Sequence, residues 1–326
     1  VKDRGVPGVK TETADSITYK FTFKQSNIKL SEPVQVSTTD FAPAFYLSTF
    51  KDYLEYGQAF EARAKDTAKV TKQVKQLAEE ITQGITDRKA QARALYNWVS
   101  MEIRYVAIYM GSGGVVPHKA DDIIRNRYGD CKDKNTLLIA LLKAKGIEAS
   151  SAVINSGNAY SLPELPIFRP FNHVITYLPE WDLYVDTTQE LAPFGELSDS
   201  LVDKTVLLTG LNKIGKTPKL SPENNRIITH SSIKIMPNGE MKGASHTTYK
   251  GNREIAARYR FERHVSTSAA KMVSDQLFKF RETGTGKFKP TDVYNLNKPF
   301  ELLTEFNLDP NTNFPGPGAM TVPVGL

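Results

Sequence analysis

One continuous apolar segment limits the folds open to this chain of 326 residues. The run Leu137-Leu138-Ile139-Ala140-Leu141-Leu142 follows Cys131 by six residues and stops shortly before Gly146. A surface helix carries its apolar residues on one stripe, whereas this run would be apolar on every side of a helix. We therefore expect a buried helix at the centre of its domain, ending at the glycine.

The residues around this run show both helical and strand periodicity. Apolar residues at helical spacing predict helices over about 70–81, 87–103 and 120–127. Apolar runs and alternating patterns predict strands, the first of them half-buried, over about 17–23, 150–154, 172–178, 183–187, 226–235 and 241–250. The last two should be joined by a turn at Asn238-Gly239, and a basic amphipathic helix should follow from 252 to about 280. The order predicts an α+β fold with β-rich parts at both ends.

Composition and charge argue against a nucleic-acid partner and against a membrane span. The net charge of +6 is mild for this length and no dense Lys/Arg block is present, so we expect no nucleic-acid partner. No apolar run approaches the roughly 20 residues of a membrane-spanning helix, so we expect no membrane span in this chain. The chain begins at Val1 without a signal segment and ends in a Pro- and Gly-containing stretch, so we expect a processed or excised piece of something longer.

The single cysteine narrows the chemistry further. One Cys rules out a disulfide framework and every Cys-based zinc module. Cys131 directly follows Gly129-Asp130 at the start of the buried helix, where unpaired N–H groups and the helix dipole favour a thiolate and could hold an oxyanion. Two interpretations stay open at this point, a lone nucleophile or a small inert buried side chain.

A nucleophilic thiolate needs a base, and His173 is the strongest candidate. It lies in the apolar strand Phe171–Tyr177, and a second strand leads to Asp186 after a short loop. If the loop is symmetric, with Tyr177 opposite Asp182, then His173 and Asp186 are directly opposed on one face. Asp186 would then accept the Nδ1–H of the imidazole, fix its tautomer and stabilise imidazolium. The alternative is a cross-strand polar pair with a purely structural use.

The other histidines are weaker candidates for a catalytic base or a metal ligand. His118 lies in the loop Pro117-His118-Lys119, where we expect a solvated side chain. No two histidines have the short spacing of a helix or turn ligand set, so we expect neither a metal site nor a cofactor.

Three motifs, in this order along the chain, resemble the transglutaminase-like superfamily. They are Arg127-Tyr128-Gly129-Asp130-Cys131-Lys132-Asp133-Lys134, Phe171-Asn172-His173-Val174 and Tyr184-Val185-Asp186-Thr187-Thr188. The lead-in segments 98–106 and 114–117 resemble bacterial members, in which the domain follows a β-rich domain of unknown function. The resemblance spans about residues 15–210 and implies a papain-like core, with a central helix against an antiparallel sheet. Thr187 departs from it, since many relatives have proline after the acid.

By this resemblance Cys131 is the nucleophile, His173 the base and acid, and Asp186 the orienting residue. Tyr105 and Tyr109 are candidates for an extra oxyanion donor, with packing as the alternative for each. The resemblance and the pattern of strands and helices beyond it together predict three domains: the C-terminal part of a β-rich domain (1–50), a transglutaminase-like catalytic domain (51–205), and a truncated β-rich domain with one long helix (206–326).

The resemblance implies cysteine-dependent acyl transfer through a thioester acyl-enzyme. The substrates would be peptide, isopeptide or glutamine amides, and the enzyme a transglutaminase-like acyltransferase, a protease or an amidase, depending on whether an amine or water resolves the thioester. The alternative function is a catalytically inactive binding or scaffold module whose β-rich domains dock a protein partner. Such relatives are usually exported by bacteria, so we expect a periplasmic or cell-surface location.

Overall fold

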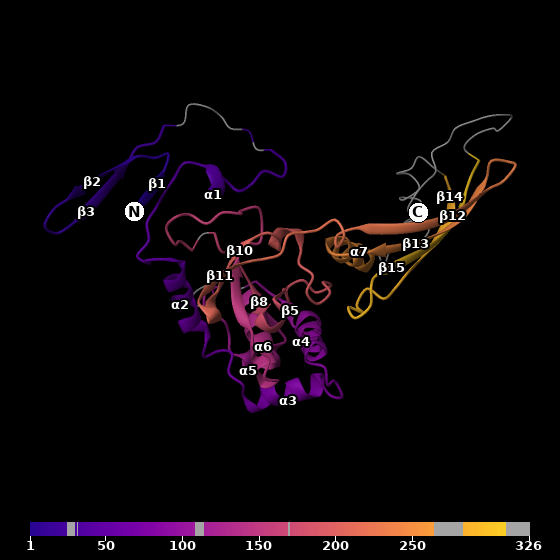
Figure 1. Ribbon diagram of the computed structural model, residues 1–326, viewed down its shortest axis with the longest axis horizontal. Helices are drawn as coiled ribbons and strands as arrows, with labels where there is room; N and C mark the ends of the chain where they lie inside the picture. The colour runs from indigo at the N-terminus through magenta and orange to yellow at the C-terminus, as the bar shows by residue number, and fades with distance from the viewer. Residues whose placement is uncertain (25–29, 31, 108–113, 169, 264–282, 311–326) are drawn as a thin grey trace. The chain divides into compact units, whose positions relative to one another are not determined.

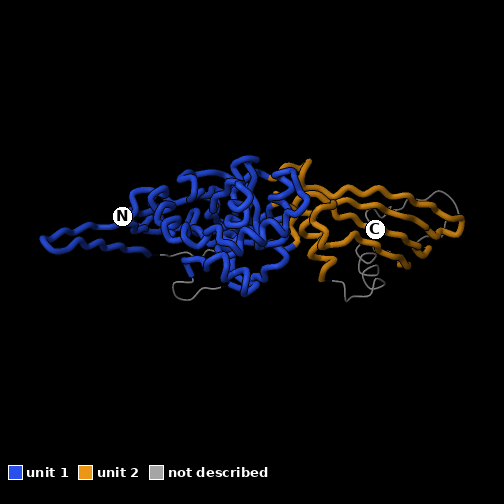
Figure 2. Tube along the Cα trace, turned by 90° about the horizontal axis from the view of Figure 1, so that it is seen from below, with its two compact units in different colours: residues 1–190, 197–219 blue, residues 191–196, 220–326 orange. Residues whose placement is uncertain are grey.

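The structure is a computed structural model that describes residues 1–24, 30, 32–107, 114–168, 170–263 and 283–310 (Figure 1). The chain separates into two compact units, one of residues 1–190 and 197–219 and the other of residues 191–196 and 220–326 (Figure 2). Each unit contains a sheet of its own, and the division into three domains stays a prediction. Within the described ranges, no helix combines the length and apolar character needed to cross a membrane.

An antiparallel sheet of five strands, in the order β11-β10-β7-β8-β9, forms the centre of the first unit. The strands are β7 (Ser150–Ile154), β8 (His173–Leu178), β9 (Leu183–Val185), β10 (Thr205–Leu208) and β11 (Lys213–Lys216). Successive side chains point to opposite faces. One face buries Ile154 and Ile175 against Leu201. The other buries Val153 against Tyr56 of helix α2 (Tyr53–Ala64).

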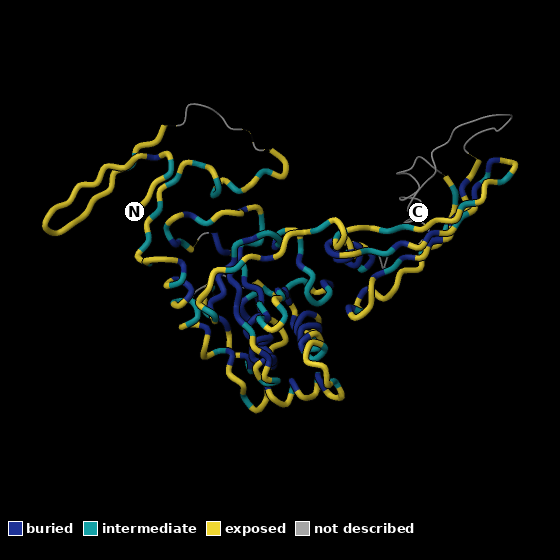
Figure 3. The backbone as a smooth tube through the Cα atoms, in the orientation of Figure 1, coloured by how far each residue is buried: buried dark blue, intermediate teal, exposed yellow. Residues whose placement is uncertain are grey.

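The predicted central helix is confirmed. Helix α6 (Cys131–Ala144) is buried at every residue from Lys132 to Leu142 and packs on β7 and β8 (Figure 3). Helices α3 (Lys72–Ile81), α4 (Arg88–Glu102) and α5 (Ala120–Asn126) also pack against it. Gly146, at φ 66°, follows the helix end in the left-handed conformation that glycine adopts most easily.

A short parallel pairing leads the chain into α6. Strand β5 (Arg104–Tyr105) pairs with β6 (Tyr128–Gly129), and the N–H of Val106 donates to the carbonyl of Gly129 at 3.0 Å. A Cβ atom on Gly129 would lie 2.5 Å from the Cβ of Asp133. The position before Asp130 therefore needs a glycine, because the helix packs directly against the entering backbone.

Two small antiparallel sheets form the N-terminal part. Strand β1 (Lys2–Arg4) pairs with β4 (Ala44–Tyr46), and β2 (Gly8–Glu12) pairs with β3 (Ile17–Phe21), while α1 (Thr38–Phe41) precedes β4. The half-burial predicted for the strand at 17–23 is wrong. Ile17 and Tyr19 are exposed, because β2 is the one strand that pairs with β3 in the part of the chain described.

The second unit is built on a four-stranded antiparallel sheet in the order β12-β13-β15-β14. The strands are β12 (Ile227–Ile235), β13 (Met241–Tyr249), β14 (Gly284–Pro290) and β15 (Glu301–Leu308). The turn at Asn238-Gly239 is confirmed, with Gly239 at φ 86°. Helix α7 (Asn252–Arg263) packs Phe261 against Phe300, and the rest of the predicted long helix lies outside the described residues. The predicted α+β fold with β-rich parts at both ends is confirmed.

Candidate active site

Cys131 is the first residue of α6 and is half-buried. The side chain of Asp130 accepts the N–H groups of Lys132 and Asp133, and the side chain of Asp133 accepts the N–H of Asp130, which is a capping box. Among the residues that the structure describes, no hydrogen bond engages the N–H of Cys131. The sulfur atom therefore sits at the positive end of a buried helix, beside an open backbone donor.

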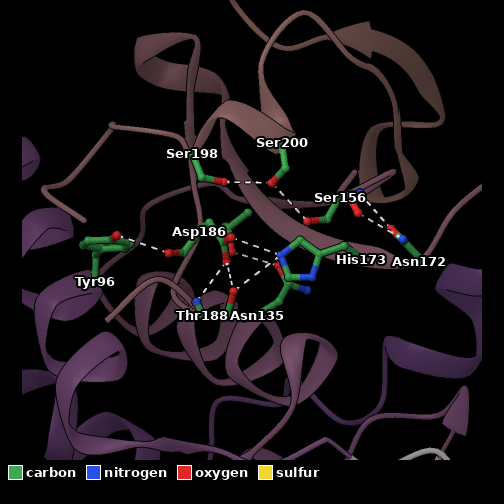
Figure 4. Close-up of polar contacts among 10 residues, drawn as sticks. Tyr96, Asn135, Ser156, Asn172, His173, Asp186, Thr188, Ser198 and Ser200 are labelled. Carbon is green, nitrogen blue, oxygen red and sulfur yellow. Dashed lines mark hydrogen bonds and ion pairs between the residues drawn. The ribbon is translucent and has the colours of Figure 1, made fainter. Parts of the chain in front are cut away.

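His173 and Asp186 are in direct contact, with the imidazole pointing toward the carboxylate (Figure 4). His173 Nε2 lies 3.0 Å from Asp186 Oδ2, and only 10% and 1% of the two side chains are exposed. Asp186 Oδ1 also accepts the backbone N–H of Thr188 at 2.9 Å and its hydroxyl at 2.8 Å. Burial alone would raise the pKa of Asp186, but the charge and hydrogen bond of His173 and the Thr188 donors lower it.

The charge of Asp186 in turn raises the pKa of His173. Burial lowers the pKa of His173, while the charge and hydrogen bond of Asp186, and then those of Cys131, raise it to about 10. The imidazole thus contacts Asp186 through Nε2, and Cys131 lies near enough to raise its pKa as well. The three residues predicted from separate motifs come together around one ring, which is an imidazolium at neutral pH.

The register predicted for the β8–β9 hairpin is wrong by two residues. Tyr177 pairs with Tyr184, and Leu178 pairs with Leu183. Leu178 and Leu183 close the hairpin, because residues 179–181 form a turn of 3₁₀ helix and Asp182 adopts a left-handed conformation at φ 47°.

The slip keeps the candidate pair in contact because strand side chains repeat every two residues. Extending the observed register places Asp186 opposite Ile175, so that it reaches His173 diagonally on the same face. The prediction that Nδ1 faces Asp186 is also wrong, since Nε2 makes that contact. Nδ1 is therefore the ring nitrogen left for the sulfur.

A buried polar bridge that the sequence analysis missed holds α6 against the sheet. Asn135 lies one turn after Cys131; its Nδ2 donates to Ser151 Oγ at 2.8 Å, and its Oδ1 accepts the Thr176 hydroxyl at 2.8 Å. These bonds link the helix of the nucleophile to β7 and to the strand of His173, and so fix its rotation about its axis. An amide four residues after the cysteine, just before an all-apolar run, was the available signal.

Two further side chains around α6 were misjudged or missed. His118 is not a purely solvated histidine, because its Nδ1 lies 3.1 Å from Oδ2 of the buried Asp133. Lys134 is fully buried and donates to the carbonyls of Ser100 and Ile103 at the end of α4. Burial lowers the pKa of Lys134 to about 8, although nearby carboxylates oppose this.

Of the two candidate oxyanion tyrosines, Tyr105 lies among the described residues and Tyr109 does not. Tyr105 lies in β5, with 45% of its surface exposed, and its backbone pairs with Gly129, two residues before the cysteine. Its role as a donor stays a prediction, and Tyr109 lies outside the described residues. Within the described ranges, no cluster of His, Cys, Asp or Glu is arranged to hold a metal ion.

Comparison with known proteins agrees with the resemblance of the motifs. Residues 75–158, which include Cys131 and end before His173 and Asp186, match the family model of the transglutaminase-like superfamily. No curated protein matches the chain. A crystal structure of a candidate protease from Parabacteroides distasonis is 11% identical with a TM-score of 0.55, and the match covers 94% of this chain and 62% of that one.

At such low identity the likeness shows the fold alone, and this chain spans less than two thirds of that protein. A candidate cysteine protease from Cytophaga hutchinsonii is 22% identical, and the match covers 36% of this chain and 37% of that one. Its TM-score of 0.27 is too low to show a common fold. The family match, its cysteine and the shared fold agree with the three motifs. Residues 75–158, which carry Cys131, are therefore similar to the transglutaminase-like superfamily.

Proposed function

We propose that this chain catalyses acyl transfer through a thioester on Cys131. The observation that carries the proposal is the buried His173 imidazole, which contacts Asp186 at 3.0 Å and whose pKa is raised by Asp186 and by the nearby Cys131. In this proposal Cys131 is the nucleophile, His173 the acid and base, and Asp186 the carboxylate that orients and charges the imidazole.

The raised pKa of His173 determines the order of proton transfers. Because the imidazole holds its proton at neutral pH, His173 acts first as an acid, and the thiolate is the nucleophilic form of Cys131. The thiolate attacks the carbonyl carbon, and the C=O electron pair moves to oxygen beside the Cys131 N–H. When the C=O bond reforms, the C–N bond breaks and the leaving amine takes the proton from His173 Nδ1.

The thioester is then resolved by water or by an amine. The attacking group gives a proton to Nδ1, the second tetrahedral intermediate collapses, and the C–S bond breaks so that the sulfur leaves as a thiolate and the imidazole is again protonated. Water releases a carboxylic acid, whereas an amine gives a new amide. Peptide, isopeptide and glutamine amides are the substrates proposed, and hydrolysis is the favoured outcome because water is always present.

Alkylation of the single cysteine tests the proposed site directly, because any label reports on Cys131. We expect iodoacetamide to label the protein at pH 6, Cys131→Ala to remove labelling, and His173→Ala to slow it by at least about tenfold. His246→Ala is the matched control, since His246 is also paired with a carboxylate, Glu301, at 3.1 Å. Labelling that rises only above pH 8 and is unchanged in His173→Ala would sink the proposal and leave a non-catalytic module.

A mass measurement then separates the two outcomes of catalysis. Intact-mass analysis with glutaminyl peptides and simple peptides should trap an acyl-enzyme on the wild type and none on Cys131→Ala. Adding a primary amine to the trapped species distinguishes crosslinking, which transfers the acyl group to the amine, from hydrolysis, which ignores it.

A further inference from the structure

A second histidine–carboxylate pair lies at the start of α6. His118 Nδ1 is 3.1 Å from Asp133 Oδ2 and 3.2 Å from Oδ1, and the backbone N–H of His118 donates to Oδ1 at 2.8 Å. The Asp133 side chain is completely buried, while 46% of the His118 side chain is exposed. The imidazole thus covers the solvent side of a buried carboxylate.

Asp133 also holds the backbone that leads into the nucleophile. Its Oδ2 accepts the N–H of Asp130 at 3.2 Å, and its Cβ packs directly against Gly129. Asp130 in turn caps the helix by accepting the N–H groups of Lys132 and Asp133. The next peptide N–H is that of Cys131, the open donor at which a developing oxyanion would be held.

His118 is the side-chain donor on which the buried Asp133 carboxylate depends. The nearby cation of Lys132 is bonded to Asp130 Oδ2, so it is already engaged. Without the imidazole, Asp133 would keep two backbone donors but lose its side-chain donor, and a buried carboxylate short of donors is costly. The carboxylate would then turn toward water, and this movement would weaken its bond to the N–H of Asp130.

We propose that His118 is a positioning residue for acyl transfer: through Asp133 it holds the Asp130–Cys131 peptide so that the Cys131 N–H is aimed at the oxyanion. The inference rests on the function proposed above and adds a residue to it. His118 touches neither the substrate nor the sulfur in this account, and its effect is confined to steps that build negative charge on a carbonyl oxygen.

Two reactions at the same sulfur test this assignment. Acylation by p-nitrophenyl acetate passes through a tetrahedral oxyanion, whereas alkylation by iodoacetamide displaces iodide and builds none. We expect His118→Ala to slow the p-nitrophenolate burst about tenfold and to change the alkylation rate by less than about twofold. His118→Asn should restore the burst, because the asparagine Nδ2 occupies the place of Nδ1 and can donate to Asp133.

The matched control is His246→Ala, which removes an imidazole with the same 46% exposure and the same 3.1 Å contact to a carboxylate. It should leave both reactions unchanged. Equal slowing of both reactions in His118→Ala would overturn the proposal, as would a burst in His118→Asn no faster than in His118→Ala. If His118→Ala does not fold, His118→Ser, whose hydroxyl is too short to reach Asp133, takes its place.

Hydrogen exchange separates a failure of this inference from a failure of the proposed function. If the wild-type protein gives no burst at all, Cys131 is not an acyl-transfer nucleophile and the proposed function falls. Exchange of the amides at Asp130 and Cys131, followed by mass spectrometry, should still be faster in His118→Ala than in His246→Ala. Identical exchange in the two variants would show that His118 does not hold this backbone.

Discussion

Replacing Asp186 by asparagine removes the charge that keeps His173 protonated while preserving the shape of the side chain. Asparagine can still accept the N–H and hydroxyl of Thr188 through one oxygen, so the loop after β9 keeps its bonds. The imidazole keeps its burial, which lowers its pKa, but loses the charge that raises it. The imidazole should then no longer hold its proton near neutral pH.

The structure sets the size of the effect. The difference between the ordinary histidine pKa of 6.5 and about 10 corresponds to about 5 kcal/mol, at roughly 1.4 kcal/mol per tenfold change in the protonation constant. Asp186 is the largest contributor that raises the pKa, so most of this free energy should disappear with its charge. We expect alkylation of Cys131 at pH 6 to slow by at least about 100-fold in Asp186→Asn.

The assay is the rate of iodoacetamide labelling from pH 5 to 10. The gap between wild type and Asp186→Asn should be widest at pH 6 and should close above the ordinary thiol pKa of about 8.5, where the thiolate forms without help. Asp182→Asn is the control, because Asp182 lies in the same hairpin, accepts the Tyr177 hydroxyl at 2.7 Å, and adopts a left-handed conformation that asparagine tolerates. An Asp186→Asn profile that overlays the wild type would refute the charge argument.

Three further predictions concern stability and can be measured by urea unfolding. Gly129→Ala places a Cβ 2.5 Å from that of Asp133 and should lower the unfolding free energy by about 1–3 kcal/mol, so a variant as stable as wild type contradicts the packing argument. Thr188→Val removes the hydroxyl that donates to Asp186 and should cost about 1 kcal/mol, and no loss would mean that this bond adds nothing. The folded chain binds the His173 proton more tightly than the unfolded chain, so this contribution is full below pH 6.5 and is lost as pH rises toward 10. The wild-type midpoint should therefore fall over that range more than that of His173→Ala, and parallel midpoints would exclude the linkage.

The central helix could be predicted from the sequence because burial on all sides has a direct signature, an uninterrupted apolar run after a capping residue. Strands β7, β8 and β9 of the central sheet followed from their apolar patterns for the same reason, whereas β10 and β11 were not predicted. The contact between His173 and Asp186 was predicted with the wrong register, because the path of a short loop depends on local backbone angles such as that of Asp182. The twofold repeat of strands made the prediction tolerant of a slip by two residues, and a slip by one would have separated the pair.

Contacts between elements were harder to predict. The bridge from Asn135 to Thr176 and the bond from His118 to Asp133 join residues on different elements, and their geometry depends on how those elements pack. Sequence spacing reports which residues share a face, but it does not report which side chain a loop residue will meet. The choice of His173 Nε2 over Nδ1 for Asp186 is likewise set by the direction from which β9 arrives.

The division of the site between a helix and a hairpin has a consequence for how the protein acquires its reactivity. Cys131 and His173 are brought together when α6 docks on β8, and each is an ordinary side chain before that step. If Cys131 is the proposed nucleophile, the thiol of a newly made chain should react no faster than an ordinary cysteine until the core has assembled. The rate at which this single cysteine is labelled at pH 6 should therefore report the fraction of molecules that have completed folding.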